Sequence, residues 1–318
     1  MIVALAAAVI GAIALPHALR LERAAPLTAG ALWAVALGLR GLTGVFVAIY
    51  VIFYLPATEL FTALTHWCWH AILPLATTHL GLSGHGVGDA IAVLPGVLLA
   101  GSVASIAFGV SRSARAVSRL VRSGALGAGP GGSVIVGGPD VLLAAAGISR
   151  PRIVVSAGAL LILDDDELAA GLDHERGHIA RRHRFVLLYA ELCRALGRFL
   201  PGTNAAVLEL GFQLERDADA WALSRRNDRY ALASAICKAA VGLQGSPALA
   251  SLGGAQVRTR VDQLVDESRP TTGWRARGMN LAAVLGAALL LGLVAAVPPT
   301  VAAGSKAASM PTPSHCRG

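Results

Sequence analysis

Charged side chains are scarce in this sequence. Only 14% of its 318 residues are Asp, Glu, Lys or Arg, and lysine occurs only at positions 238 and 306. Hydrophobic residues make up 55% of the chain, and the mean hydropathy is +0.62. Because this composition is too apolar for an ordinary soluble protein, we expect an integral membrane protein.

Four segments are long and apolar enough to cross a bilayer, which takes about 20 residues in a helix. They are residues 2–19, 30–55, 90–110 and 279–297. The first segment lacks the basic n-region of a signal peptide, so we predict a retained span rather than a cleaved leader. Residues 1–110 then form a membrane domain with three of the spans. Arg40 falls inside the second span, where it is either functional or extends toward the cytoplasmic interface.

Lysine and arginine are absent from the connector at 56–88, whereas Arg20 and Arg23 follow the first span and four further arginines follow the third. By the positive-inside rule, the arginine-bearing connectors are cytoplasmic. We therefore predict one cytoplasmic domain at 111–278 and extracytoplasmic termini, including a short tail at 298–318. The net charge of +8 follows from this bias and from a basic face toward anionic lipid, so no nucleic-acid binding is expected.

The connector at 56–88 concentrates histidines, and the chain has only four cysteines. The connector histidines are His66, His70, His79 and His85. We predict an interfacial segment there, with a metal or pH-sensing site as the alternative. Cys68 and Cys316 are predicted outside the cell, and Cys193 and Cys237 in the reducing cytosol. We expect free thiols, and the alternative is a disulfide between Cys68 and Cys316.

The cytoplasmic region has the pattern of an α+β domain. Two β-branched runs, at 133–136 and 152–156, predict strands, and the glycine-rich stretch at 123–132 predicts a flexible linker before them. A cluster of aspartates can cap the helix that follows. Helices are predicted at 163–182, 185–199, 204–225 and 230–243.

The first of these helices contains the motif H-E-x-x-H, formed by His174, Glu175 and His178. Histidines four residues apart leave the same face of a helix. Two such imidazoles can bind one Zn²⁺ while the intervening Glu175 acts as the general base. The alternative is a helix whose histidines are only polar surface residues. Gly177, which is unfavourable inside a helix, either allows another helix to approach closely or is simply tolerated.

A hydrolytic zinc site needs a third protein ligand. The longer motif H-E-x-x-H-x-x-G-x-x-H would place a histidine at position 184, but the sequence has Arg184 there. On a continuous helix, His183 should point about 140° away from the face of His178. A carboxylate from a later helix is therefore expected. The candidates are Glu191, Glu209 and Glu215. We prefer Glu215 because Asp219 follows it by one turn and could orient a ligand histidine.

These motifs resemble those of the BlaR/MecR-type membrane metallopeptidases. That family combines H-E-x-x-H with E-x-x-x-D, here Glu215 to Asp219, in a cytoplasmic domain between the third and fourth of four spans. The segment SRPRIVVS at 149–156 is similar to the family's proline-containing strand. The segment TRVDQL at 259–264 is loosely similar to an arginine-bearing stretch near the end of its domain.

The resemblance implies a mainly α-helical integral membrane protein with four transmembrane helices and a cytoplasmic α+β gluzincin-type metallopeptidase domain. His174, His178 and Glu215 would bind one zinc ion. Glu175 would be the general base, and Asp219 would support a ligand histidine. The implied protein substrate is a cytosolic winged-helix repressor of the BlaI type, or the chain itself. Because the sequence ends at residue 318, shortly after the fourth span, we expect no penicillin-binding sensor domain.

Two other function classes stay open. A quality-control peptidase of the HtpX kind shares the ligand pattern, although fewer spans would be expected before its metal helix. A non-enzymatic membrane scaffold with a degenerate motif would bind no zinc. For an enzyme, the strand at 152–156 is expected to hold an extended substrate by backbone pairing. The oxyanion-stabilising side chain is left open among Tyr189, Tyr230, His183 and nearby arginines.

Overall fold

The computed structural model describes most of the chain outside the connector and the tail. The described residues are 2–19, 21–55, 58–59, 94, 96–98, 100–109, 111–112, 115, 125–147, 150–242, 247–266 and 273–308. The connector histidines, Cys68 and Cys316 lie outside these residues, so the predictions made for them stay predictions. Cys193 and Cys237 are both free thiols.

Three of the segments predicted to enter a membrane form helices whose bounds the described residues give. They are α1 (Ile2–Ala18), α2 (Pro26–Ile49), which continues into a π-helical turn at Tyr50–Tyr54, and α12 (Trp274–Ala308). Among the described residues, Pro26–Tyr54 and Trp274–Lys306 are long and apolar enough to cross a membrane. The 17 residues of α1 and the helical residues between 96 and 109 are shorter than this criterion requires. Two of the four predicted spans therefore meet it.

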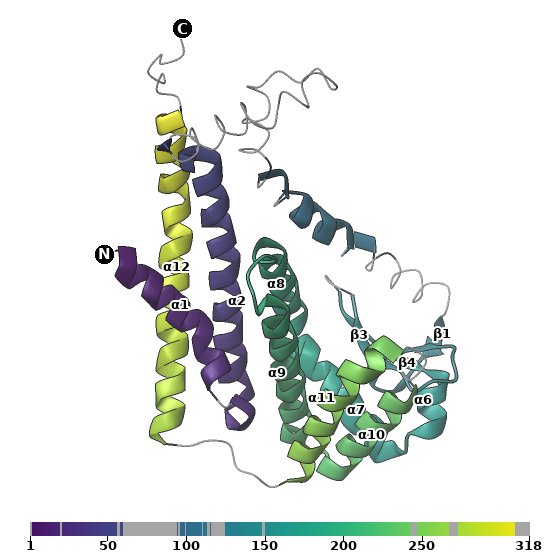
Figure 1. The fold of residues 1–318 in the computed structure, drawn as a ribbon. Helices are drawn as coiled ribbons and strands as arrows, with labels where there is room; N and C mark the ends of the chain where they lie inside the picture. The colour runs from purple at the N-terminus through teal and green to yellow at the C-terminus, as the bar shows by residue number, and fades with distance from the viewer. Residues whose placement is uncertain are drawn as a thin grey trace.

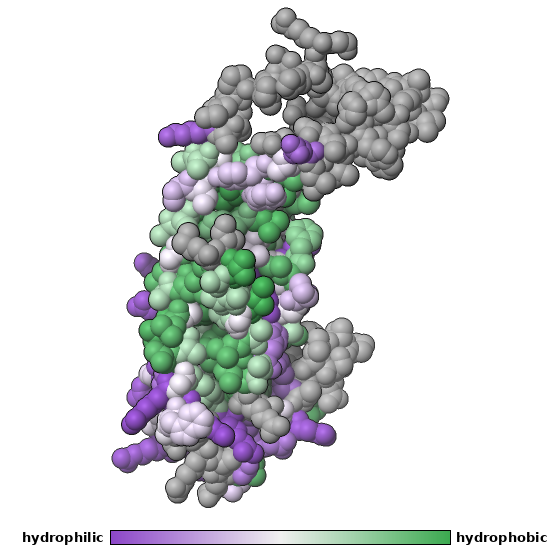
Figure 2. All heavy atoms as spheres, turned by 60° about the vertical axis from the view of Figure 1, so that its left-hand side comes forward, coloured by the Kyte–Doolittle hydropathy of each residue, from purple (hydrophilic) through white to green (hydrophobic). Residues whose placement is uncertain are grey.

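Helices α2 and α12 lie side by side and run in the same direction (Figure 1). Near their N-terminal ends, Thr28 Oγ1 donates to Asn280 Oδ1 at 2.6 Å. Near their C-terminal ends, the Tyr54 hydroxyl donates to the Thr300 carbonyl at 3.0 Å. Figure 2 shows that hydrophobic side chains form a belt over this part of the surface, with hydrophilic residues gathered at its lower end.

A four-stranded sheet begins the second part of the molecule. Its strands are β1 (Ala125–Ala128), β2 (Val134–Val136), β3 (Leu143–Ala146) and β4 (Arg152–Ser156), in the order β1-β2-β4-β3. β2 and β4 pair in parallel and confirm the two predicted strands, while β1 and β3 pair antiparallel at the edges. The linker predicted at 123–132 is wrong for the residues of β1. Pairing with β2 gives this small-residue stretch an extended conformation that its composition does not favour.

Six helices complete this part. They are α6 (Ala157–Ile162), α7 (Asp165–Ala180), α8 (His183–Leu196), α9 (Thr203–Ser224), α10 (Arg229–Gly242) and α11 (Pro247–Val265). Four of them, α7 to α10, confirm the predicted helices. The aspartate cluster caps α7 as expected: Asp164 accepts from the backbone of Glu167, and the Glu167 side chain accepts from the backbone of Asp164.

One hydrophobic core cluster is shared by the two parts. Buried residues of α2, including Leu32, Trp33 and Leu37, pack with residues of α8 and α9, including Ala190 and Leu210. Helices α8 and α9 therefore do not form a separate body, because they run along α2 (Figure 1). The close approach depends on glycine on α2: a Cβ atom at Gly44 would overlap the carbonyl of Leu196 at the end of α8.

Arg40 is buried next to this shared core. Its side chain is only 3% exposed. Its Nη2 lies 2.9 Å from His17 Nε2 at the end of α1, and its Nη1 donates to the Ala36 carbonyl at 3.4 Å. Atoms of Arg40 lie close to Gly197 and Gly202, so α1 and the α8–α9 connection enclose its side chain.

Candidate metal centre

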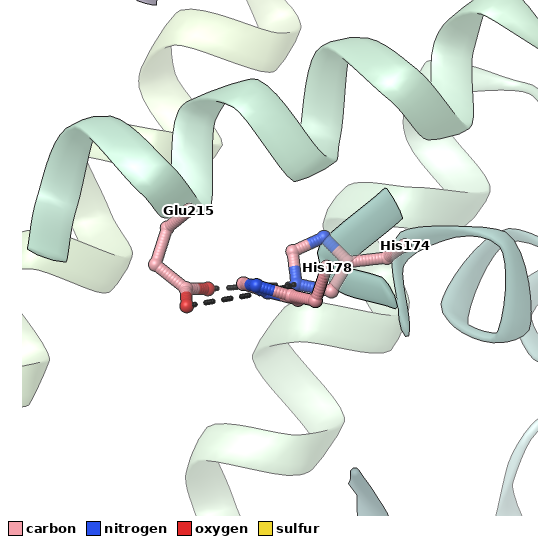
Figure 3. Close-up of side chains that lie close together, drawn as sticks. All are labelled: His174, His178 and Glu215. Atoms are coloured by element: carbon pink, nitrogen blue, oxygen red, sulfur yellow. Dashed lines mark hydrogen bonds and ion pairs between the residues drawn. The ribbon is translucent and has the colours of Figure 1, made fainter. Parts of the chain in front are cut away.

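Two helices bring three potential metal ligands together. His174 and His178 project from α7 toward α9, which carries Glu215 (Figure 3). The Nε2 atoms of the two histidines are 3.1 Å apart. His174 Nε2 lies 3.5 Å from Glu215 Oε2, and His178 Nε2 lies 3.4 Å from Oε1 of the same carboxylate. The three side chains thus present two nitrogens and a carboxylate to one point.

This donor set fits a zinc ion. Zinc–nitrogen and zinc–oxygen bonds of about 2.0–2.1 Å at tetrahedral angles put neighbouring donors about 3.3 Å apart. The separations of 3.1, 3.4 and 3.5 Å lie close to that value. Two imidazoles and one carboxylate, with a fourth position left for water or substrate, are the ligand types of a hydrolytic zinc site.

Charged side chains of α9 and α11 contact the outer sides of His174 and Glu215. His174 Nδ1 lies 2.9 Å from Asp219 Oδ1. Arg260 of α11 donates to Glu215 Oε2 at 2.8 Å and contacts both oxygens of Asp219. A carboxylate that accepts the outer N–H of a ligand imidazole fixes the ring's tautomer and orientation. Asp219 is placed for that role toward His174.

Glu175 lies beside the site and contacts the sheet. Its Oε2 accepts a hydrogen bond of 2.6 Å from the backbone N–H of Ala145 in β3. Burial raises the pKa of Glu175 to about 7, although the charge of His174 and the Ala145 hydrogen bond act in the opposite direction. A carboxylate with such a pKa can both accept and release a proton near neutral pH.

The pKa values of all three ligand side chains are shifted. Burial alone would lower the pKa of His174, but Asp219 and Glu215 outweigh it and raise this pKa to about 9. Burial lowers the pKa of His178 to about 4. Burial would raise the pKa of Glu215, but its hydrogen bond with His174 and the charge of Arg260 lower it to about 2. Since a histidine must be neutral to bind a metal, metal binding at this site would release a proton from His174.

The sequence matches the family model of Peptidase family M48 over residues 114–283, more than half of the chain. The chain belongs to Peptidase family M48. The peptidases of this family are zinc-dependent metallopeptidases, so the protein is a peptide-bond hydrolase. No curated protein matches the sequence. No solved structure matches it either.

Other candidate residues of this M48 peptidase lie apart from the three ligands. Glu191 forms an exposed ion pair with Arg194 at 2.6 Å. Tyr189, a candidate for stabilising an oxyanion, donates to the Ala34 carbonyl of α2 at 3.0 Å and so belongs to the shared core. Tyr230 lies exposed at the start of α10.

The prediction that the strand at 152–156 holds the substrate by backbone pairing is wrong. β4, residues 152–156, pairs with β2 on one side and with β3 on the other, so it has no free edge. The sequence did not reveal this because the edge strand β3 reads LAAA, which lacks the β-branched residues that predict strands.

The sequence also did not reveal how Arg260, His183 and Asp217 lie beside the site. Arg260 was represented only by a loose similarity of its segment. His183 was expected to point away from His178, yet their Nδ1 atoms are 2.9 Å apart. Asp217 was not considered, and its Oδ2 lies 3.1 Å from the other ring nitrogen of His183. His183 does not follow the spacing of a continuous helix, because α7 ends at Ala180 and α8 begins at His183.

Proposed function

We propose that this M48 peptidase is a multi-pass membrane zinc endopeptidase whose active site lies on the cytoplasmic side. His174, His178 and Glu215 would hold one zinc ion, and the donor spacing is the observation that carries this assignment. When bound, zinc supplies Lewis acidity to the scissile carbonyl and to water.

Glu175 is the proposed general base. Its Oε2 is held by the Ala145 N–H, so Oε1 is the atom that accepts a proton from the attacking water. Glu175 then returns this proton to the departing amine. Its pKa of about 7 suits both steps, because a group that must take and give a proton works best near the ambient pH. Asp219 orients His174 and takes no proton in this scheme.

The proposed substrate site is the outer edge of β3, which pairs with no further strand among the described residues. Ala145 directs its N–H away from β4 and toward Glu175, so the outer edge of β3 borders the catalytic residues. An extended peptide that pairs with this edge would pass directly beside Glu175. β1, the other edge strand, pairs with β2 and is separated from β3 by two strands.

The proposed topology has four spans at 2–19, 30–55, 90–110 and 279–297. α2 and α12 run parallel, which agrees with two spans that both leave the cytoplasm. Arg23 precedes α2, and Arg275 and Arg277 lie in the first turn of α12. Arg216, the neighbour of Glu215 on α9, donates to the carbonyls of Leu21 and Ala24 just before α2. The basic end is therefore near the metal centre, as the positive-inside rule would require for a cytoplasmic site.

The apolar surface of α12 supports a lipid environment. Its large side chains Leu281, Val284, Leu285, Leu291 and Val294 are exposed along the helix. A contiguous apolar surface of this kind is unfavourable in water. A bilayer is the surrounding that it fits.

Two classes of protein substrate follow from the resemblances. The order of motifs and spans favours regulated cleavage of a winged-helix repressor of the BlaI type, as in the BlaR/MecR-type peptidases. The match to Peptidase family M48 is equally consistent with a quality-control peptidase of the HtpX kind. Purified protein should separate them: cleavage of a folded repressor at one position supports the first, and cleavage of many unfolded membrane proteins supports the second.

The assignment of the site is tested on detergent-solubilised full-length protein. Wild type should contain about one zinc ion and cleave a test protein. Glu175→Gln should keep the zinc and lose cleavage, whereas Glu215→Ala should lose the zinc. Removal of zinc with a chelator should abolish cleavage, and added zinc should restore it. A wild-type protein that binds no zinc, or an active Glu175→Gln variant, would contradict the proposal.

A further inference from the structure

His178 has a buried histidine behind it instead of a carboxylate. His183 Nδ1 lies 2.9 Å from His178 Nδ1, and His183 Nε2 lies 3.1 Å from Asp217 Oδ2. His183 is 3% exposed and Asp217 is 4% exposed, so both side chains are shielded from solvent. Arg181 Nε lies 3.4 Å from the same oxygen of Asp217 and gives that carboxylate a neighbouring cation.

A break in the helix brings His183 into this position. Arg182 has φ 56° and ψ 34°, a left-handed conformation that costs of order 1 kcal/mol or more for a residue with a side chain. A continuous helix would turn the fifth residue after His178 about 140° away from it. The turn at Arg182 reverses this displacement, and His183, the first residue of α8, faces back toward His178.

The positions of the protons follow from the direction in which His178 faces. Its Nε2 faces His174 and Glu215, so this nitrogen must keep its lone pair to bind a metal. The proton of the neutral ring is then on Nδ1, which donates to Nδ1 of His183. His183 must therefore carry its own proton on Nε2, from which it donates to Asp217. The opposite direction would put a proton on His178 Nε2 and remove the metal-binding lone pair.

We propose that His183 and Asp217 are positioning residues that hold His178 in the tautomer and orientation required for zinc. The inference rests on the proposed zinc site, and it adds a second support chain to the one on His174. His174 leads to Asp219 and Arg260, while His178 leads through His183 to Asp217 and Arg181. Each ligand imidazole thus reaches a carboxylate that is paired with an arginine.

The test compares zinc affinity across variants of the purified full-length protein, measured by competition with a chelator. His183→Phe keeps an aromatic ring but has no acceptor for His178, and should weaken zinc binding roughly 10–100-fold. His183→Asn keeps an acceptor oxygen near the position of Nδ1 and should recover most of this loss. The absorption spectrum of cobalt-substituted protein should change in His183→Phe and return toward wild type in His183→Asn.

Thr203→Val is the matched control, because Thr203 is also buried and hydrogen-bonded but lies at the far end of α9 from Glu215. It should lower thermal stability and leave zinc affinity unchanged. If His183→Phe binds zinc as tightly as wild type, the positioning role is wrong while the zinc site stands. If wild type binds no zinc, the proposed function itself fails.

A measurement on the wild type covers the case in which His183→Phe does not fold. In zinc-loaded protein labelled with ¹⁵N-histidine, NMR distinguishes the two neutral tautomers of each ring, and the His183→Asn variant assigns the signal of His183. The proposal requires His183 to carry its proton on Nε2. A proton on Nδ1 of His183 would overturn it.

Discussion

Arg260 forms a bidentate ion pair with Asp219, in which Nε lies 2.8 Å from Oδ2 and Nη2 lies 2.7 Å from Oδ1. Its Nη1 also donates to Glu215 Oε2 at 2.8 Å. One cation on α11 therefore holds two carboxylates that lie one turn apart on α9. Without Arg260, the carboxylates of Glu215 and Asp219 would repel each other.

Replacement of Arg260 by a neutral residue should lower the stability of the zinc-free protein. Bound zinc should restore part of the lost stability. We expect Arg260→Met to lower the free energy of unfolding by about 3 kcal/mol, at the low end for a broken buried pair because the Glu215 side chain is 38% exposed. Zinc would supply part of the missing positive charge. Thermal unfolding with and without zinc should show a larger stabilisation by zinc in the variant than in wild type. Equal stabilisation of the two proteins would show that Arg260 does not balance this charge.

Gly177 should matter for zinc binding more than for stability. A Cβ atom there would lie 3.0 Å from Cβ of Trp221 on α9, so Gly177→Ala should push α7 and α9 apart by a few tenths of an ångström. The helix propensity of alanine, about 1 kcal/mol better than glycine, offsets much of the cost in stability. Because His178 and Glu215 lie on these two helices, zinc affinity should fall.

Gly211→Ala is the control for this substitution. Gly211 also lies inside a helix, on α9, but a Cβ atom there would meet nothing within 4 Å. We expect it to stabilise the protein by up to about 1 kcal/mol and to leave zinc affinity unchanged. If Gly177→Ala behaves in the same way, the close approach of α7 and α9 is not needed for the site.

The elements that the sequence predicts correctly are those with strong local signals. Helix α7 has its aspartate cap and the spacing of His174 and His178, and β2 and β4 have runs of Val and Ile. β1 and β3 consist of Ala, Gly and Leu, and only pairing with neighbouring strands makes them extended. Local propensity could not reveal them, because the hydrogen bonds that stabilise them come from the paired strands β2 and β4 and not from the segments themselves.

Within the site too, local spacing predicted some contacts, and others depend on how separate segments fold together. Spacing on one helix was enough to relate His174 to His178 and Glu215 to Asp219, and the structure brings the first three of these residues together. The contact between His183 and His178 depends on one left-handed residue, Arg182, and the contact of Arg260 depends on the docking of α11. Neither feature has a signal in the residue spacing.

Ala145 provides a test of the contact between the sheet and the general base. Its N–H points away from β4, so Ala145→Pro should keep the antiparallel pairing of β3 with β4. The hydrogen bond to Glu175 would be lost, which we expect to lower kcat/KM about 10–100-fold, because hydrogen bonds to charged groups contribute about 1.5–3 kcal/mol. Zinc content and thermal stability should stay near wild type. Unchanged cleavage would mean that Glu175 does not depend on β3.

The start of α7 should make stability depend on pH through Glu167. Burial raises the pKa of this carboxyl, but hydrogen bonds from Lys238, Ser234 and the backbone of Asp164 outweigh burial and lower the pKa below its usual 4.5. Lys238 Nζ lies 2.5 Å from Glu167 Oε2. A carboxyl whose pKa is lower in the folded state contributes stability above its unfolded pKa. That contribution is lost as the pH falls through the folded pKa.

Lys238→Met should therefore destabilise the protein at neutral pH and less so in acid. We expect a loss of about 1–2 kcal/mol at pH 7, with a difference from wild type that shrinks below about pH 4.5 as Glu167 becomes protonated. Thermal unfolding from pH 3 to pH 7 measures it. Arg194→Met is the control: it removes the exposed ion pair with Glu191 and should cost at most about 0.5 kcal/mol at any pH. A loss in Lys238→Met that is the same at pH 3 and pH 7 would show that packing, and not the charge of Glu167, stabilises the contact between α7 and α10.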